Sequence, residues 1–108
     1  MEVKTSQKEE VTVFQICGEI NITTSPELRK LFEKNCPKKI VVDLTAVGYI
    51  DSSGLATLVE MLKRCKSQGG SLGLAGMSEK VKSLFEITKL DKLFLVFPNP
   101  EEAVGKVK

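Results

Sequence analysis

Residues 40–44 read IVVDL, a short apolar run that is typical of a strand buried on both faces of a parallel sheet. Residues 45–51 follow as an expected loop, and a helix is then predicted from about Ser52. Its apolar positions lie three or four residues apart, at Leu55, Leu58, Val59, Leu62 and Cys65. Gly69-Gly70 is expected to end this helix, and SLGLA at 71–75 reads as the next strand. The order strand-helix-strand predicts two parallel strands joined by a right-handed crossover.

The same alternation extends in both directions along the chain. Upstream, residues 11–16 predict a strand that ends at Gly18 and pairs with residues 3–6 through a turn at 7–10. Ser25 and Pro26 predict the N-cap and first turn of a helix that ends before Pro37. Downstream, the expected elements are a helix capped by Ser78, a strand at 93–97 and a short helix capped by Asn99; the inward positions of the Ser78 helix are Val81, Leu84, Phe85 and Thr88. We therefore expect one α/β domain over residues 1–108, with a mixed, mainly parallel sheet and flanking helices.

Composition excludes several classes of partner and location. The 108 residues carry 16 basic and 14 acidic side chains, a net charge of +2, which is too balanced to indicate nucleic acid or a membrane surface as a partner. Residues 1–4 lack the features of a signal peptide, and no apolar run approaches the roughly 20 residues that span a bilayer. The expected location is the cytoplasm.

The cysteine and histidine content argues against most catalytic and metal chemistry. Cys17, Cys36 and Cys65 are widely spaced, form no CxxC pair and lie in or beside apolar segments, which predicts buried small hydrophobic residues. The sequence has no histidine, so the usual Ser-His and Cys-His pairs and the common zinc sites are excluded. We expect no cofactor, no metal and no enzymatic activity.

The segment DSSG at residues 51–54 is the candidate site. It opens a helix directly after a buried strand, where α/β proteins usually place their sites, and the free N–H groups of a helix start favour negative charge. The simplest structural interpretation is that the segment is an ordinary N-cap, since Asp and Ser both cap helices. One cap needs only one such side chain, however. If Asp51 or Ser52 caps the helix, Ser53 has a free hydroxyl, and Gly54 beside it would let another protein approach the backbone.

Three other functions were considered for this chain, and the sequence supports each of them less well. A strand-serine-helix turn occurs in hydrolases, but GxSxG is missing and there is no histidine to serve as base. The glycines between 69 and 76 match neither GxGxxG nor the P-loop, and they are expected to serve turns. Asp43 and Asp51 do not form the acidic cluster that a response-regulator receiver needs for magnesium.

Beyond these patterns, the chain resembles the STAS family of anti-anti-sigma factors. The likeness rests on residues 51–55 with the preceding strand at 40–44, on Gly18-Glu19-Ile20-Asn21 with the helix after it, and on residues 81–94 with Glu101-Glu102-Ala103. Together these blocks cover most of the chain. The resemblance implies a compact α/β domain with a mixed sheet.

The resemblance also implies a function by partner switching. In the family, the unphosphorylated protein binds an anti-sigma factor that is itself a serine kinase, and this binding frees the sigma factor. The kinase phosphorylates the second serine of the motif, here Ser53, and the complex dissociates; a separate serine phosphatase reverses the modification. This sequence departs from the family at Asn21, where aspartate is common, which leaves partner identity and kinase recognition open.

The expected partner surface is the loop from Gly48 to Gly54 with the exposed face of the following helix, bordered by residues 21–24. Its members are Asp51, Ser52, Ser53, Gly54, Ala56, Thr57, Glu60, Met61, Asn21 and Thr24. The chain is expected to be a monomer or a weak dimer. Two rival functions remain at this point. One is a constitutive STAS scaffold or sensor component of a larger signalling assembly, and the other is a small enzyme that uses a cysteine.

Overall fold

The computed structural model describes residues 1–35 and 37–107, and it begins with a β-hairpin. Strands β1 (Glu2–Lys8) and β2 (Val11–Ile20) pair antiparallel. The turn contains only Glu9 and Glu10, both with positive φ (50° and 71°). The predicted hairpin is confirmed, with longer strands and a shorter turn than the expected residues 7–10.

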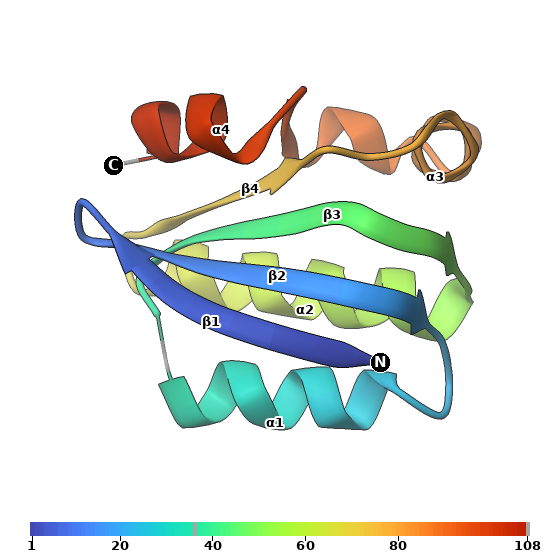
Figure 1. Cartoon of the computed structure of the whole chain (residues 1–108), viewed down its shortest axis with the longest axis horizontal. Helices are drawn as coiled ribbons and strands as arrows, with labels where there is room; N and C mark the ends of the chain where they lie inside the picture. The colour runs from blue at the N-terminus through green and yellow to red at the C-terminus, as the bar shows by residue number, and fades with distance from the viewer. Residues whose placement is uncertain (36, 108) are drawn as a thin grey trace.

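The rest of the sheet is parallel. Strands β3 (Lys39–Ile50), β4 (Ser71–Ala75) and β5 (Leu95–Phe97) follow, and the strand order β1-β2-β3-β4-β5 is the order in the sequence. Every pair from β2 to β5 is parallel. Figure 1 shows β1 to β4 side by side, with the hairpin at one edge. The predicted α/β fold with a mixed, mainly parallel sheet is confirmed.

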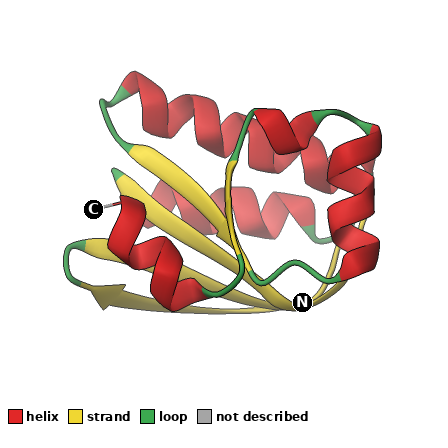
Figure 2. Ribbon diagram, turned by 90° about the horizontal axis from the view of Figure 1, so that it is seen from above, coloured by secondary structure: helices red, strands yellow, loops and turns green. Residues whose placement is uncertain are grey.

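Helices cover both faces of the sheet (Figures 1 and 2). The helices α1 (Ser25–Asn35), α2 (Ser52–Ser67) and α3 (Glu79–Ile87) bury their apolar side chains in one core with Phe14 of β2 and Val42 of β3. The short α4 (Pro100–Val107) packs Ala103, Val104 and Val107 on the other face, against Val11, Val13, Val41 and Ala75. Strand β3 is therefore buried on both sides, as its apolar run predicts.

The predicted loop at residues 45–51 is wrong, because β3 continues to Ile50. Strand β2 likewise passes Gly18 and ends at Ile20. Two irregularities in the β2–β3 register, between Gln15 and Cys17 and between Gly18 and Glu19, keep the longer strands paired. They bring Ile20 level with Ile50, so the loop that follows β2 and the start of α2 lie side by side.

Smaller corrections concern helix and strand ends. Strand β5 begins at Leu95 rather than 93, because a 3-10 helix, η1 (Leu90–Lys92), precedes it, and Phe94 is buried with its ring edge against Phe85 at 5.7 Å between centroids. Thr88 is exposed at the end of α3. The predicted caps are confirmed at Ser78 and Asn99, whose side-chain oxygens accept the N–H groups of Val81 and Glu102.

Burial makes one cysteine unreactive. Cys65 is fully buried, as predicted, and burial raises the pKa of its thiol to about 11. Its Sγ–H donates a weak hydrogen bond to the Pro37 carbonyl at 3.8 Å. A smaller fraction of a thiol with a raised pKa is present as the nucleophilic thiolate, which argues against Cys65 as the catalytic residue of an enzyme. Cys17 is half-buried, and Cys36 lies outside the described residues.

The Cys65 pKa predicts a loss of stability at high pH. Between about pH 9 and 11 the unfolded chain releases this proton while the folded chain keeps it, so the free energy of unfolding falls with pH. The slope is about 1.4 kcal/mol per pH unit, which gives about 3 kcal/mol over this range. Urea denaturation of the wild type and of Cys65→Ala from pH 8 to 11 measures it. The variant starts less stable but loses less on alkalinisation, whereas parallel curves would contradict the prediction.

Candidate functional site

Asp51 fixes the start of α2. Its Oδ1 accepts the backbone N–H of Gly54 at 2.9 Å, and its carbonyl accepts the N–H of Leu55 at 2.9 Å. Its second carboxylate oxygen, Oδ2, accepts the N–H of Ile22 at 3.0 Å. Of the two possible caps in the sequence, Asp51 is the one used. The same side chain therefore holds the loop 21–24 against the helix start.

The loop 21–24 is shaped by its own side chains. The Oδ1 of Asn21 accepts the N–H groups of Thr23 and Thr24 at 2.9 and 3.1 Å. The Thr24 hydroxyl donates to the Glu19 carbonyl at 2.9 Å and accepts the N–H of Asn21. An amide oxygen makes these contacts as well as a carboxylate oxygen would. Asn21 therefore supports the loop geometry without adding a charge to this site.

The two serines differ in exposure. Ser52 is exposed and Ser53 is half-buried, and the Ser53 hydroxyl makes no hydrogen bond within residues 1–35 and 37–107. The Ser53 carbonyl accepts the Thr57 hydroxyl at 3.0 Å. Both serines belong to the first helical turn, whose N–H groups have no partner inside the helix and favour negative charge. The Ser53 oxygen is thus available for modification at a point that tolerates an anion.

A groove lies between α1 and α2 beside Ser53. Its volume is about 280 Å³, and its lining residues come from loop 21–24 and both helices: Ile22, Ser25, Pro26, Arg29, Ser53, Ala56 and Thr57. Ile22 is 73% exposed, so it offers an apolar side chain to solvent at the edge of this groove. Loop, groove and helix start thus form one continuous surface around Ser53.

Comparison with known proteins places the chain in a family. The STAS domain model matches residues 2–103. The chain is also 36% identical over 106 residues to the anti-sigma-B factor antagonist of Bacillus subtilis, which covers 94% of this chain and 95% of the relative. This chain belongs to the STAS domain family. The resemblance in the DSSG segment and its neighbouring blocks is therefore confirmed.

Solved structures agree with the STAS fold. An anti-sigma factor antagonist from Mycobacterium paratuberculosis matches with a TM-score of 0.88 at 26% identity, over 98% of this chain and 92% of that one. The Bacillus cell fate determinant SpoIIAA, solved in its phosphorylated form, matches with a TM-score of 0.76 at 17% identity, over 99% and 100% of the two chains. The second likeness is one of fold alone. Among residues 1–35 and 37–107 of the STAS domain, no helix is long and apolar enough to cross a membrane.

The predicted exposed face of α2 needs correction. Thr57 and Met61 are buried, with 0% and 1% of their surface exposed. The Thr57 hydroxyl accepts the Arg29 guanidinium of α1 at 3.4 Å, and Met61 belongs to the apolar core that α1, α2 and the sheet share. Ala56 is exposed, and Glu60 is half-exposed and pairs with Arg29 at 2.9 Å. Thr57 and Met61 therefore cannot contact a partner in this structure, whereas Asp51, Ser52, Ser53, Ala56 and Glu60 remain accessible.

Gly54 is buried, and its role differs from the predicted one. A Cβ at this position would lie 2.5 Å from the Ile20 carbonyl oxygen and 2.7 Å from Cγ2 of Ile50. The close approach that needs glycine is thus made by the ends of β2 and β3 within the STAS domain. The interpretation that Gly54 admits another protein is not needed to explain it.

The structure adds Ser25 and Arg29 to the site, which sequence reasoning missed, and it singles out Ile22 within the predicted border of residues 21–24. An isoleucine in an otherwise polar loop was the available signal for Ile22. The Ser25 hydroxyl does not cap α1 as predicted, because the Thr24 carbonyl accepts the first N–H groups of the helix and Ser25 lies inside it. Arg29 carried no signal, since its place depends on how α1 packs on α2.

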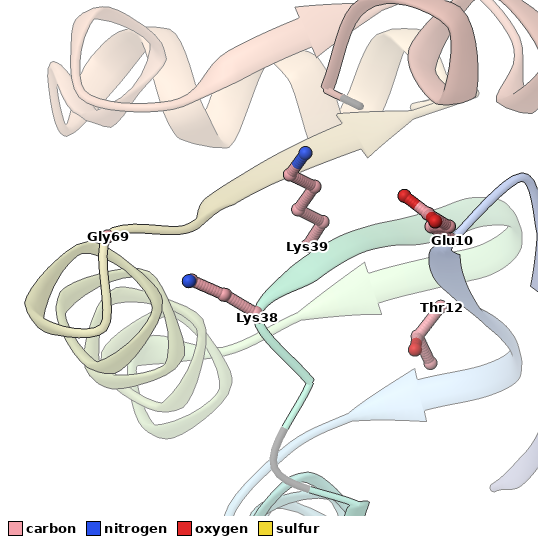
Figure 3. A pocket seen from close by; sticks show the side chains of 5 residues that line it. All are labelled: Glu10, Thr12, Lys38, Lys39 and Gly69. Atoms are coloured by element: carbon pink, nitrogen blue, oxygen red, sulfur yellow. The ribbon is translucent and has the colours of Figure 1, made fainter.

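A larger hollow of about 440 Å³ lies at the other end of the sheet, where the parallel strands begin (Figure 3). Glu10, Thr12, Lys38, Lys39 and Gly69 line it. Sites in open α/β sheets lie at the carboxyl ends of the strands, which here is the Ser53 end. Volume alone is therefore a poor guide in this STAS domain, and the smaller groove is the candidate site.

Proposed function

We propose that this chain is an anti-sigma factor antagonist that phosphorylation of Ser53 switches off. Unphosphorylated, it binds an anti-sigma factor that is also a serine kinase, and the sigma factor is released in the cytoplasm. A serine phosphatase restores the active form. The anti-sigma-B factor antagonist of Bacillus subtilis supports this function by similarity. The antagonist itself carries out no catalysis.

One observation carries the proposal. Within residues 1–35 and 37–107, the half-buried Ser53 hydroxyl has no hydrogen-bond partner, and it lies at a helix start that Asp51 already caps. In the reaction, the Ser53 Oγ forms a bond to the γ-phosphorus of ATP, the bond from that phosphorus to ADP breaks, and the hydroxyl proton passes to a base of the kinase. Ser53 needs no nucleophile activation from its own chain, because the partner supplies the catalytic groups.

The switch works by electrostatics and desolvation. A phosphate adds about 1.5 to 2 negative charges beside the Asp51 carboxylate. At a separation of roughly 6 Å the repulsion is about 1 kcal/mol in water and about 5 kcal/mol at an effective dielectric of about 20. A partner that excludes water from this surface moves the repulsion toward the larger value and must also desolvate the phosphate. Each ~1.4 kcal/mol weakens binding about tenfold, so no refolding is required.

The proposed partner surface is the part of the site that solvent reaches. It comprises Asp51, Ser52, Ser53, Ala56 and Glu60 with the loop from Asn21 to Thr24, and Ile22 supplies its most exposed apolar side chain. An apolar anchor surrounded by polar groups is a common arrangement in protein interfaces.

Phosphorylation by the kinase tests the proposal. We expect the anti-sigma factor that co-purifies from native cells, given ATP, to place one phosphate on Ser53, as read by mass spectrometry of the tryptic peptides. Ser53→Ala should remove the modification and Ser52→Ala should keep it. The two variants delete the same hydroxyl at adjacent positions. A phosphate on Ser52, or unchanged phosphorylation of Ser53→Ala, would contradict the assignment.

A further inference from the structure

Ser25 is an unusual residue in the groove. It is 4% exposed, and its hydroxyl oxygen is a buried polar atom without a hydrogen-bond partner in the described part of the chain. A buried unsatisfied hydroxyl costs free energy, about 1 to 3 kcal/mol, and such groups are rare in folded proteins. Ser25 also lines the groove next to Ser53. The fold thus keeps a free donor where the modified serine lies.

Arg29 is the one charged side chain among the described residues that line this groove. Its Nε donates to Glu60 Oε2 at 2.9 Å, and its second guanidinium nitrogen lies 3.4 Å from the Thr57 hydroxyl. Ser53, Thr57 and Glu60 lie on one side of α2, at spacings of four and three residues. At 1.5 Å per residue, Ser53 lies about 10 Å along the helix axis from Glu60 but only about 6 Å from Thr57. The guanidinium already reaches the Thr57 hydroxyl, so a change of side-chain rotamer that moves it by about one helical turn brings it to Ser53.

The present pairing of Arg29 is easy to exchange. Arg29 and Glu60 are 44% and 42% exposed, and ion pairs exposed to this extent contribute about 0 to 1 kcal/mol. A phosphate dianion carries more charge than the Glu60 carboxylate and has three acceptor oxygens, two of which can accept from the planar guanidinium at once, so it is the stronger partner.

We propose that the groove is an intramolecular cradle for the phosphate on Ser53, with the Arg29 guanidinium and the Ser25 hydroxyl as its donors. The proposal rests on the phosphorylation proposed above and adds a structural consequence to it. Once bound, the phosphate occupies the groove beside Ile22 and removes Arg29 from Glu60. The groove is then closed to a partner, and the modified surface gains the uncompensated charge of Glu60. Repulsion and occlusion act together.

The test uses protein with phosphoserine placed at residue 53 during translation, so that no kinase is needed. The second ionisation of the phosphate is followed by phosphorus NMR as a function of pH. We expect Arg29→Gln to raise its pKa by about half a unit or more, because a nearby cation favours the dianion. Lys30→Gln is the matched control: it removes the same charge from the next residue of α1, which is exposed and does not line the groove. It should shift the pKa less.

The remaining charged groups near the groove are constant in this comparison. Asp51 and Glu60 on α2, and Glu27 on α1, are present in both variants, and they affect the phosphate equally. A second measurement reports on Arg29 directly, because its Nε–H proton signal should move on phosphorylation of Ser53. Arg29→Lys keeps the positive charge but lacks the two parallel donors of the guanidinium. The phosphate pKa in this variant should lie between those of wild type and Arg29→Gln.

Ser25→Ala tests the second donor. In the unphosphorylated protein it should leave the urea midpoint unchanged or raise it, since it removes an unsatisfied hydroxyl. In the phosphorylated protein it should lower the midpoint relative to phosphorylated wild type. Equal phosphate pKa values in Arg29→Gln and Lys30→Gln, with an unmoved Arg29 signal, would overturn the cradle. Failure of the kinase assay would overturn the proposed function and leave these measurements unaffected.

Discussion

Ser53→Asp is expected to weaken binding to the anti-sigma factor by about 10- to 100-fold. The substituted carboxylate adds one negative charge next to Asp51, at the centre of the accessible surface. At roughly 6 Å and an effective dielectric of about 20, the repulsion between two unit charges is about 3 kcal/mol, and desolvation of the new carboxylate adds to it. Every ~1.4 kcal/mol is a factor of ten in affinity. Isothermal titration calorimetry of the purified pair measures the change.

Ser52→Asp is the matched control for this substitution. It adds the same charge one residue earlier, on a side chain that is exposed and does not line the groove. Although Ser52 also belongs to the proposed partner surface, Ser52→Asp should cost less affinity than Ser53→Asp, because solvent and salt screen a charge on the more exposed side chain better. Ser53→Asn has nearly the same size as Ser53→Asp without the charge, and it should bind much better than Ser53→Asp. Undiminished binding of Ser53→Asp would instead favour the constitutive scaffold, and equal losses at both serines would indicate a general sensitivity to charge.

The fold could be predicted because its elements have distinct periods. Residues 40–44 and 71–75 are apolar runs of strand length, and both form strands. The apolar residues of 55–65 repeat with the helical period, and this segment forms a helix. The second half of β3 could not be predicted in the same way. Val47 and Ile50 are its buried residues, three positions apart, because the irregular register with β2 breaks the strand period of two.

The site was predicted only as far as it is local in the sequence. The cap at Asp51 and the spare hydroxyl at Ser53 follow from residue types within one helical turn. The burial of Thr57 and Met61 does not, because it results from the packing of α1 across α2, which the period of one helix does not reveal. The groove with Ser25 and Arg29 depends on the same packing. The sequence therefore locates the modified residue but not the surface around it.

Gly54→Ala is expected to destabilise the protein by about 2 kcal/mol. Two effects compete. Alanine favours the helical conformation over glycine by about 1 kcal/mol. Against this, the new Cβ would lie 2.5 Å from the Ile20 carbonyl oxygen, an atom of backbone that is anchored because it accepts the N–H of Asp51 at 3.1 Å. Relieving this contact means moving α2 away from the ends of β2 and β3, and overpacking of this kind costs about 1 to 3 kcal/mol or more.

Gly48→Ala provides the matched comparison. Gly48 is exposed in β3, and a Cβ there meets no atom within 4 Å. Its free energy of unfolding should stay within about 0.5 kcal/mol of wild type, or rise as the unfolded chain loses freedom. Thermal unfolding measures both variants, since a change of 1 kcal/mol in the free energy of unfolding shifts the melting temperature by about 4 to 8 °C. If Gly54→Ala were as stable as Gly48→Ala, the glycine after Ser53 would not serve internal packing, and approach of a partner to the backbone would become its explanation.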